Sequence, residues 1–144
     1  MSPPCNKAER NFATPNRDKI KVAFVIWTLE GMGGSEKVVY DIVRKLDKRF
    51  YSIVIVGLTD GPVRKIYEKI GARVFAISNA DRVNFSFIRQ IRKILLEENI
   101  AIINAHHFSP IFYSFLATQF LGMKLVYTEH SRWQWNSYGQ YKSF

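Results

Sequence analysis

The chain has 144 residues, of which 47% are hydrophobic, 15% aromatic and 23% charged. This composition excludes a largely disordered chain, a collagen-like repeat and a disulfide scaffold, and the length suffices to bury the core of one domain. Lysine and arginine number 21 against 12 acidic residues, a net charge of +9. The excess of basic residues favours an anionic partner such as a membrane surface, a nucleotide, a phosphorylated substrate or a nucleic acid.

Residues 1–19 hold three prolines and only scattered apolar side chains, so we expect a disordered leader and no secretory signal. The leader carries the single cysteine, Cys5, which fits a reducing compartment. The uncharged stretch 100–123 is interrupted by Asn104, two histidines and Pro110. A strand, a polar loop and a buried helix explain it better than a membrane span. We therefore expect a cytoplasmic protein, soluble or peripheral to a membrane.

From residue 20 onward, apolar runs typical of buried strands alternate with helical periods. Strands are expected at residues 20–27, 53–56, 73–77, 100–103 and 124–127. Helices are expected after Ser35 as N-cap, from Gly61-Pro62 to about residue 70 with Gly71 as its C-terminal cap, from Asn84 or Ser86, and from Pro110 to about Gly122. The first of these helices has Val38, Val39, Ile42, Val43 and Leu46 at helical spacing.

Strands that alternate with helices predict an α/β fold built on a parallel sheet with right-handed crossovers. The expected strand order is 3-2-1-4-5, a Rossmann-like arrangement with helices on both faces. In this order the first and fourth strands are neighbours, and a crevice opens at their C-terminal ends. The loops that reach it are residues 28–35, 104–109 and 128–131, so we expect the ligand site there.

The first loop, residues 28–35, places Gly31, Gly33 and Gly34 directly before a helix. Glycines let the backbone approach a ligand closely, and a helix N-terminus offers N–H groups to an anion. The alternative is a strand-to-helix turn that needs a positive φ. A dinucleotide fingerprint starting at Gly31 would need glycine at Glu36, and no G-K-[ST] ends a phosphate loop. Hydride transfer and ATP hydrolysis are therefore disfavoured.

The second and third loops carry the three histidines. His106 and His107 are adjacent, and His130 follows Glu129 after the fifth strand. No cysteine is near and no H-E-x-x-H occurs, so we expect no metal site. A neutral imidazole can accept a proton from a substrate hydroxyl or form a hydrogen bond with it. The alternatives are satisfied polar residues and a polar loop that closes the sheet.

Three segments in one α/β unit carry a resemblance to a known family. They are Gly33-Gly34-x-Glu36 after the first strand, Asn104-Ala105-His106-His107 before an apolar helix, and Thr128-Glu129-His130-Ser131 after the fifth strand. Over residues 21–133 the chain resembles the N-terminal domain of family 4 glycosyltransferases, which have the GT-B fold. Such enzymes have two Rossmann-like domains that face each other across a cleft. The N-terminal domain mainly receives the acceptor, and the C-terminal one holds most of the nucleotide-sugar.

The resemblance implies a set of substrate-binding residues: Gly33, Gly34, Glu36, His106, His107, Glu129 and His130. Gly33 and Gly34 would approach the donor diphosphate or the acceptor. His106 matches the second histidine of the family's H-x-H pattern and is the candidate catalytic residue facing the reacting sugar. The first position of that pattern is Asn104, so the pair is incomplete. His130 would lie near the acceptor rim. The resemblance also implies transfer with retention of configuration, no metal and no cofactor, with the donor's own phosphate as base.

These observations divide the chain into a leader (1–19), an acceptor-side domain (20–131) and an aromatic tail or the start of a continuation (132–144). The family's acidic E-x7-E element is absent. We therefore expect the nucleotide-sugar to bind mainly to a missing C-terminal domain or a partner chain, and this chain alone to be inactive. The alternative is a non-catalytic docking subunit that recruits a donor-binding chain to a membrane, with an apolar patch from Trp133, Trp135, Tyr138, Tyr141 and Phe144.

The expected acceptor is a glycan or a lipid-linked sugar. Family members resemble peripheral membrane enzymes, and a basic face for anionic lipid could come from Arg89, Arg92, Lys93, Lys37, Arg44, Lys45 and Lys48. The alternative for these side chains is a solvated helix face. Nucleic-acid binding is not expected, because no recognition motif accompanies the charge and the aromatic residues do not interleave with it.

Overall fold

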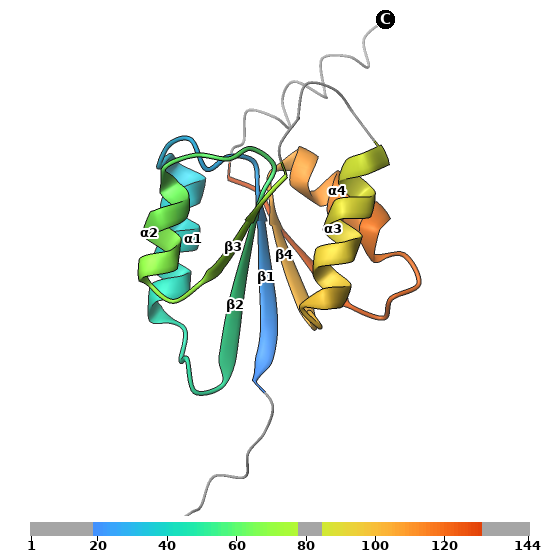
Figure 1. Cartoon of the computed structure of the whole chain (residues 1–144), viewed down its shortest axis with the longest axis horizontal. Coiled ribbons are helices and arrows are strands. Elements are labelled where there is room, and N and C mark those ends of the chain that lie inside the picture. The colour runs from blue at the N-terminus through green and yellow to red at the C-terminus, as the bar shows by residue number, and fades with distance from the viewer. Residues whose placement is uncertain (1–18, 78–84, 131–144) are drawn as a thin grey trace, which may run out of the picture.

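The computed structural model describes residues 19–77 and 85–130. In chain order the elements are β1 (Ile20–Ile26), α1 (Gly34–Lys45), β2 (Tyr51–Gly57), α2 (Val63–Lys69), β3 (Arg73–Ala76), α3 (Phe85–Glu97), β4 (Ile102–His106), α4 (Phe108–Thr118) and β5 (Lys124–Thr128). The strands form one parallel sheet in the order β3-β2-β1-β4-β5 (Figure 1). The predicted fold class and strand order are confirmed. The predicted leader, the aromatic tail and Asn84 lie outside the described residues, apart from Lys19.

The sheet is covered by helices on both faces, with α1 and α2 on one side and α3 and α4 on the other (Figure 1). Successive residues of β1 point to opposite faces. Ala23 and Val25 belong to a core with residues of α3 and α4. Phe24 and Ile26 belong to a second core with residues of α1 and α2. This double burial explains why β1 is a nearly continuous apolar run. It also means that the outer surfaces of α1 and α3 lie on opposite sides of the molecule.

The N-cap of α1 is Gly33, so the prediction of Ser35 as N-cap is wrong. Ser35 lies inside the first turn, and its hydroxyl donates to the carboxylate of Glu36 instead. Of the apolar positions predicted for this helix, Val39 and Val43 are buried, whereas Val38 and Ile42 are exposed by 41% and 36%. Leu46 and Tyr40 are partly buried and pack against the same core as Val39 and Val43, so α1 contacts the sheet along one face.

The fourth strand begins at Ile102 and runs to His106, not from residue 100 to residue 103 as predicted. Ile100 belongs to the end of α3, because its N–H donates to the carbonyl of Leu95 and Asn99 has a φ of 52°. The strand continues through Asn104 and His106 because β5 offers partners there, with His106 opposite Thr128. The predicted loop of residues 104–109 is therefore reduced to one residue, His107, between β4 and α4.

Helix α4 starts at Phe108, two residues before the predicted start, and ends at Thr118, well before Gly122. Pro110 lies in the first turn, where its missing N–H removes no helical hydrogen bond. The helix ends because Gln119 leaves the helical conformation and Phe120 adopts a φ of 64°. In the part of the chain that the structure describes, no helix is both long and apolar enough to cross a membrane.

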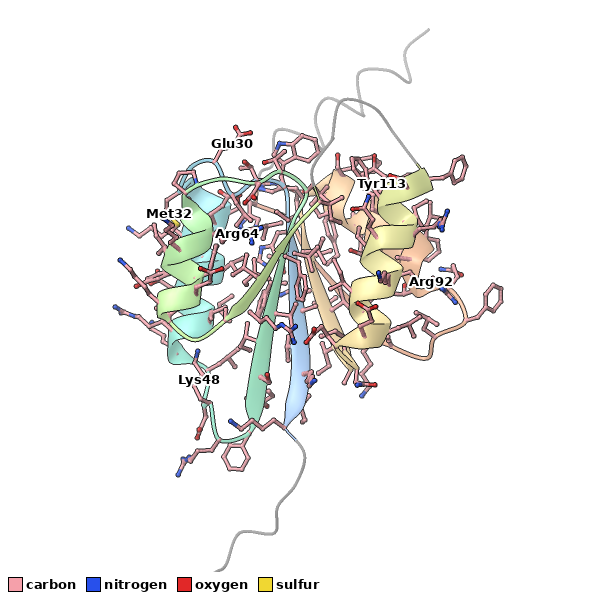
Figure 2. All side chains as sticks on the ribbon, viewed as in Figure 1. Glu30, Met32, Lys48, Arg64, Arg92 and Tyr113 are labelled. Atoms are coloured by element: carbon pink, nitrogen blue, oxygen red, sulfur yellow. The ribbon has the colours of Figure 1, made fainter. Side chains whose placement is uncertain are left out.

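Two of the basic residues of the predicted basic face bind helix ends. The guanidinium of Arg92 donates to the carbonyls of Ala117 and Gln119 at the end of α4, at 3.0 and 2.9 Å. The ammonium of Lys48 donates to the carbonyl of Ile70 after α2. Figure 2 shows Arg92 on the side of α3 and α4, and Lys48 on the other side near the end of α1. Cations at helix C-termini interact favourably with the helix dipole, so both side chains stabilise the fold.

The loop after β2 packs tightly on the loop after β1. The N–H of Val63 donates to the carbonyl of Leu29 at 3.0 Å, and the hydroxyl of Thr59 donates to that of Thr28 at 2.8 Å. A Cβ on Gly61 would lie 2.3 Å from the carbonyl oxygen of Leu29 and 2.5 Å from the Cα of Glu30. The close approach of the two backbones therefore requires glycine at position 61. The contacts between the two loops hold the first loop in place.

We expect Gly61→Ala to destabilise the chain by about 1–3 kcal/mol, because backbone atoms of the first loop must move to admit the methyl group. Gly31→Ala is the matched control, since a Cβ there meets nothing within 4 Å, and we expect a change within about 0.5 kcal/mol. Urea unfolding of the two variants and of the wild type measures both values. Equal stabilities of the two variants would contradict this account of Gly61.

Candidate functional site

The C-terminal ends of β1, β4 and β5 lie side by side, because the strands are parallel and adjacent. The ladder places Asn104 of β4 opposite Phe24 of β1 on one side and Val126 of β5 on the other. His106 ends β4, and His130 lies two residues beyond the end of β5. The first loop leads from β1 to the N-terminus of α1. The sheet thus brings all three predicted loops to one edge.

His106 is fully buried behind His130. Its Nδ1 lies 2.6 Å from Nε2 of His130, and the two rings stack with centroids 4.9 Å apart. Phe24 of β1 lies behind His106 with a ring-centroid distance of 6.0 Å. Among the described residues, Nε2 of His106 has no hydrogen-bond partner. The candidate catalytic residue therefore points into the molecule, and His130 covers the nitrogen that faces outward.

Burial first, and then the nearby His130 and His107, lower the pKa of His106 to about 4. Burial also lowers the pKa of His130, as does the nearby His107, while the carboxylates of Glu129 and Glu36 oppose that shift. Both imidazoles are therefore neutral at neutral pH. One nitrogen of the 2.6 Å contact donates and the other accepts. A neutral pair of this kind can form hydrogen bonds with an uncharged hydroxyl.

His107 has a strained backbone. It joins β4 directly to α4 with φ 73° and ψ 168°, a region that is essentially restricted to glycine and costs roughly 1–3 kcal/mol. The turn is held by hydrogen bonds from the His107 N–H to the carbonyl of Thr128 and from the Ile111 N–H to the carbonyl of His107, both 3.2 Å. The His107 ring lies 5.0 Å from that of His130 and is partly exposed. Strain of this kind clusters at functional sites.

Glu36 lies at the first turn of α1 and is only 4% exposed. Its Oε2 accepts a hydrogen bond from the hydroxyl of Ser35 at 2.9 Å. Tyr67, a fully buried residue of α2, donates its hydroxyl to the backbone carbonyl of Glu36 at 2.7 Å. Gly33 and Gly34 are exposed beside it. The structure therefore places Gly33, Gly34 and Glu36 together at the start of α1.

The remaining predicted residues hold the third loop. Asn104 accepts a hydrogen bond from the hydroxyl of Thr128 at 2.9 Å, so the amide joins β4 to β5. Glu129 accepts a hydrogen bond from the Tyr127 hydroxyl and one from the N–H of His130. Within residues 19–77 and 85–130, no group of three or more histidines, cysteines and acidic residues could hold a metal ion.

Sequence reasoning missed two residues that support the site. Tyr67 holds the first turn of α1, and Phe24 lies against the His106 ring. Phe24 is part of the apolar run of β1, and Tyr67 is one of the few apolar residues of the charged helix α2. In neither setting does a pattern distinguish a residue that touches the site from one that only fills the core. The alternation of β1 was the available signal for Phe24, since its neighbour Val25 points to the opposite face.

Similarity to known proteins agrees with this architecture. A glycosyltransferase from Rickettsia africae matches with a TM-score of 0.63 at 18% identity, over 89% of this chain and 35% of that chain. A Listeria monocytogenes protein assigned as a UDP-N-acetylglucosamine 2-epimerase matches with a TM-score of 0.62 at 18% identity, over 88% of this chain and 35% of that one. MurG of Acinetobacter baumannii matches with a TM-score of 0.58 at 11% identity, over 76% and 35%. The chain thus spans about a third of the length of these structures.

No curated protein sequence matches the chain. The sequence profile of Glycosyltransferase Family 4 matches residues 32–144, which include the start of α1, the three histidines and all strands from β2 to β5. The sheet order and the four helices correspond to one Rossmann-like half of the GT-B fold. With the profile covering most of its length, the chain belongs to glycosyltransferase family 4.

Proposed function

We propose that this chain is the acceptor-side half of a retaining glycosyltransferase that transfers a hexose from a nucleotide-sugar to a glycan or lipid-linked acceptor. The observation that carries the proposal is the cluster of His106, His107 and His130 at the C-terminal edge of the sheet, in a chain of family 4. The carboxylate of Glu36 at the start of α1 raises the pKa of His130 against the effect of burial. Hydroxyl groups are the part of an acceptor that neutral imidazoles and a carboxylate recognise.

The three histidines have different parts in this proposal. His130 and His107 are partly exposed and would meet the acceptor. His106 is buried and would act as a positioning residue, because its Nδ1 contacts Nε2 of His130 and so fixes the plane of that ring. The strained backbone of His107 supports the proposal that this residue meets the acceptor, because such strain clusters at functional sites.

We propose that the donor nucleotide-sugar is held mainly by a C-terminal domain or a partner chain, and that this chain alone does not turn over. Its 35% coverage of the matched structures supports this reading. In the transfer, the bond between the anomeric carbon and the donor phosphate breaks, a bond to the acceptor oxygen forms, and the acceptor proton passes to the donor phosphate. This scheme, from the resemblance, uses no metal and no further cofactor.

We also propose that the protein acts at the cytoplasmic face of a membrane and meets anionic lipid through α3 and α4. The outer faces of these helices expose Phe85, Leu96, Phe112 and Phe115, and carry Arg89 and Lys93. The broader basic face expected from the sequence is not one surface, because Lys37, Arg44, Lys45 and Lys48 belong to the side of α1 and α2. Exposed aromatic residues beside cations suit a lipid surface.

The acceptor proposal is tested by NMR titration of the isotope-labelled chain with alkyl glycosides, oligosaccharides, UDP-glucose and GDP-mannose. We expect a glycoside to shift the ring signals of His107 and His130 more strongly than either nucleotide-sugar does. His130→Ala should weaken that binding about fivefold through the lost hydrogen bond, whereas Gln90→Ala on the outer face of α3 should leave it unchanged. Stronger shifts of the same rings by the nucleotide-sugars would contradict the acceptor role.

The neutral histidine pair makes stability depend on pH. The pKa of His106 is about 4 in the folded chain and about 6.5 in the unfolded one, so the unfolded chain binds more protons between these values. The stability from neutral His106 is complete above pH 6.5, and about 3 kcal/mol is lost as pH falls to 4. Urea unfolding at several pH values should give a shallower decline for His106→Phe. If the free energy of unfolding of the wild type and of His106→Phe declined equally as the pH falls, the pH dependence would not come from His106.

Membrane contact is tested by co-sedimentation with vesicles of phosphatidylcholine, alone and mixed with phosphatidylglycerol. We expect binding to the anionic vesicles, reduced about fivefold for each charge removed by Arg89→Gln and Lys93→Gln. Arg44→Gln with Lys45→Gln on α1 is the matched control on the opposite side of the sheet and should have little effect. Equal binding to neutral and anionic vesicles would rule out the proposed contact.

A further inference from the structure

Trp27 is an exposed aromatic residue at the end of β1. It directly follows the strand and is 44% exposed, whereas the five residues before it are buried. Ala23 and Val25 belong to the core under α3 and α4, and because side chains alternate along a strand, Trp27 is on the same side of the sheet. The indole therefore lies at the C-terminal edge of the sheet, with a large part of its surface open to solvent.

The register of the sheet places Trp27 beside the histidine cluster. The β1–β4 ladder ends with Val25 opposite Ala105. Trp27 and His107 each follow two residues later. Beyond this point β1 leads to α1 and β4 leads to α4, on opposite faces of the sheet (Figure 1). Two neighbouring parallel strands that diverge in this way leave a crevice between their C-terminal ends. Trp27 and His107 therefore lie on its two sides.

The backbone of Trp27 is held in place. Its carbonyl accepts a hydrogen bond from the N–H of Thr59 at 3.2 Å. The hydroxyl of the next residue, Thr28, accepts hydrogen bonds from the Thr59 hydroxyl at 2.8 Å and from the N–H of Glu30 at 3.0 Å. The indole has only two rotatable side-chain bonds on this fixed backbone, so it loses little conformational entropy when a ligand packs against it.

We propose that Trp27 is a substrate-binding residue, and that its indole is the platform on which the acceptor sugar lies. A pyranose ring with equatorial hydroxyls presents C–H groups on its faces and hydroxyls around its rim. The negative face of an indole attracts such C–H groups, and the neutral imidazoles of His107 and His130 can form hydrogen bonds with the hydroxyls. The inference rests on the proposed acceptor function and names the class of acceptor, which is a pyranose with an apolar face.

The test is an NMR titration of the full chain with methyl β-D-glucopyranoside, whose hydroxyls are all equatorial. The readout is the indole N–H signal of Trp27, identified by its absence in Trp27→Phe. We expect a saturable shift of this signal together with the ring signals of His107 and His130. Trp27→Leu keeps an apolar side chain and removes the ring, so it should bind the glycoside about fivefold more weakly, whereas Trp27→Phe should lose about twofold.

Phe50→Leu is the matched control. Phe50 is 56% exposed, and its carbonyl accepts a hydrogen bond from the N–H of Ile20, the first residue of β1. This variant therefore removes an exposed ring at the opposite end of the strand. It should bind the glycoside as the wild type does.

An indole signal that stays unchanged while the glycoside shifts the rings of His107 and His130 would overturn the platform and leave the acceptor function intact. Equal affinity of Trp27→Leu and the wild type for the glycoside would do the same. A larger shift of the indole by uridine than by the glycoside would also overturn it, because the ring would then stack on a base. If Trp27→Leu does not fold, the wild-type titration still decides by itself.

The failure of the acceptor function has a different signature. In that case UDP-glucose shifts both histidine rings more strongly than the glycoside does, while uridine leaves the indole signal of Trp27 unchanged. If Trp27→Leu also weakens the binding of UDP-glucose, the acceptor function is refuted and the sugar platform stands.

Discussion

The pairing of β4 against β1 is the contact that the candidate site depends on. β1 is bonded along its length to β2 on one edge and from Val22 to Val25 to β4 on the other. Parallel strands end at the same edge, so this ladder carries the end of β4 to the loop that leaves β1. Because β1 is buried on both faces, its register is fixed. A shift by one residue would move each of its side chains to the core on the opposite face of the sheet. The start of α1, which carries Glu36, and the histidines are far apart in the sequence, and they lie at the same end of the sheet as a consequence.

Apolar runs and helical periods sufficed to predict the sheet and its order, since each strand covered on both faces leaves a continuous signal. The ends of the elements were less predictable. Ile100 reads as a strand residue, but Asn99 adopts a positive φ and turns it into the close of α3. Between β4 and α4, a single residue, His107, stands where a longer loop was predicted. Its positive φ is not one that the conformational preferences of histidine suggest. Where a single residue with a positive φ decides the end of a helix or strand, the residue types around it do not predict that end.

In the candidate site, too, some features were predictable from the sequence and others were not. The glycines, Glu36 and the three histidines could be named because polar residues at the ends of apolar strands are conspicuous. Their orientation could not, since His106 faces inward only because Phe24 and His130 enclose it. Charge was the least informative pattern. Arg92 and Lys48 read as solvent-facing cations, yet both bind the carbonyls of helix ends that lie elsewhere in the sequence.

Because a single residue links β4 to α4, the number of residues between the two elements cannot change without moving one of them. His106 pairs with Thr128 in the sheet, and His107 bonds to the carbonyl of the same Thr128, so both neighbours are fixed against one point of β5. An insertion or deletion of one residue between Ile102 and Phe108 would exchange the buried and the partly exposed imidazole. It would also rotate the start of α4 by about a quarter turn. This segment can therefore diverge by substitution but not by length, and grafting it elsewhere requires the β5 end with it.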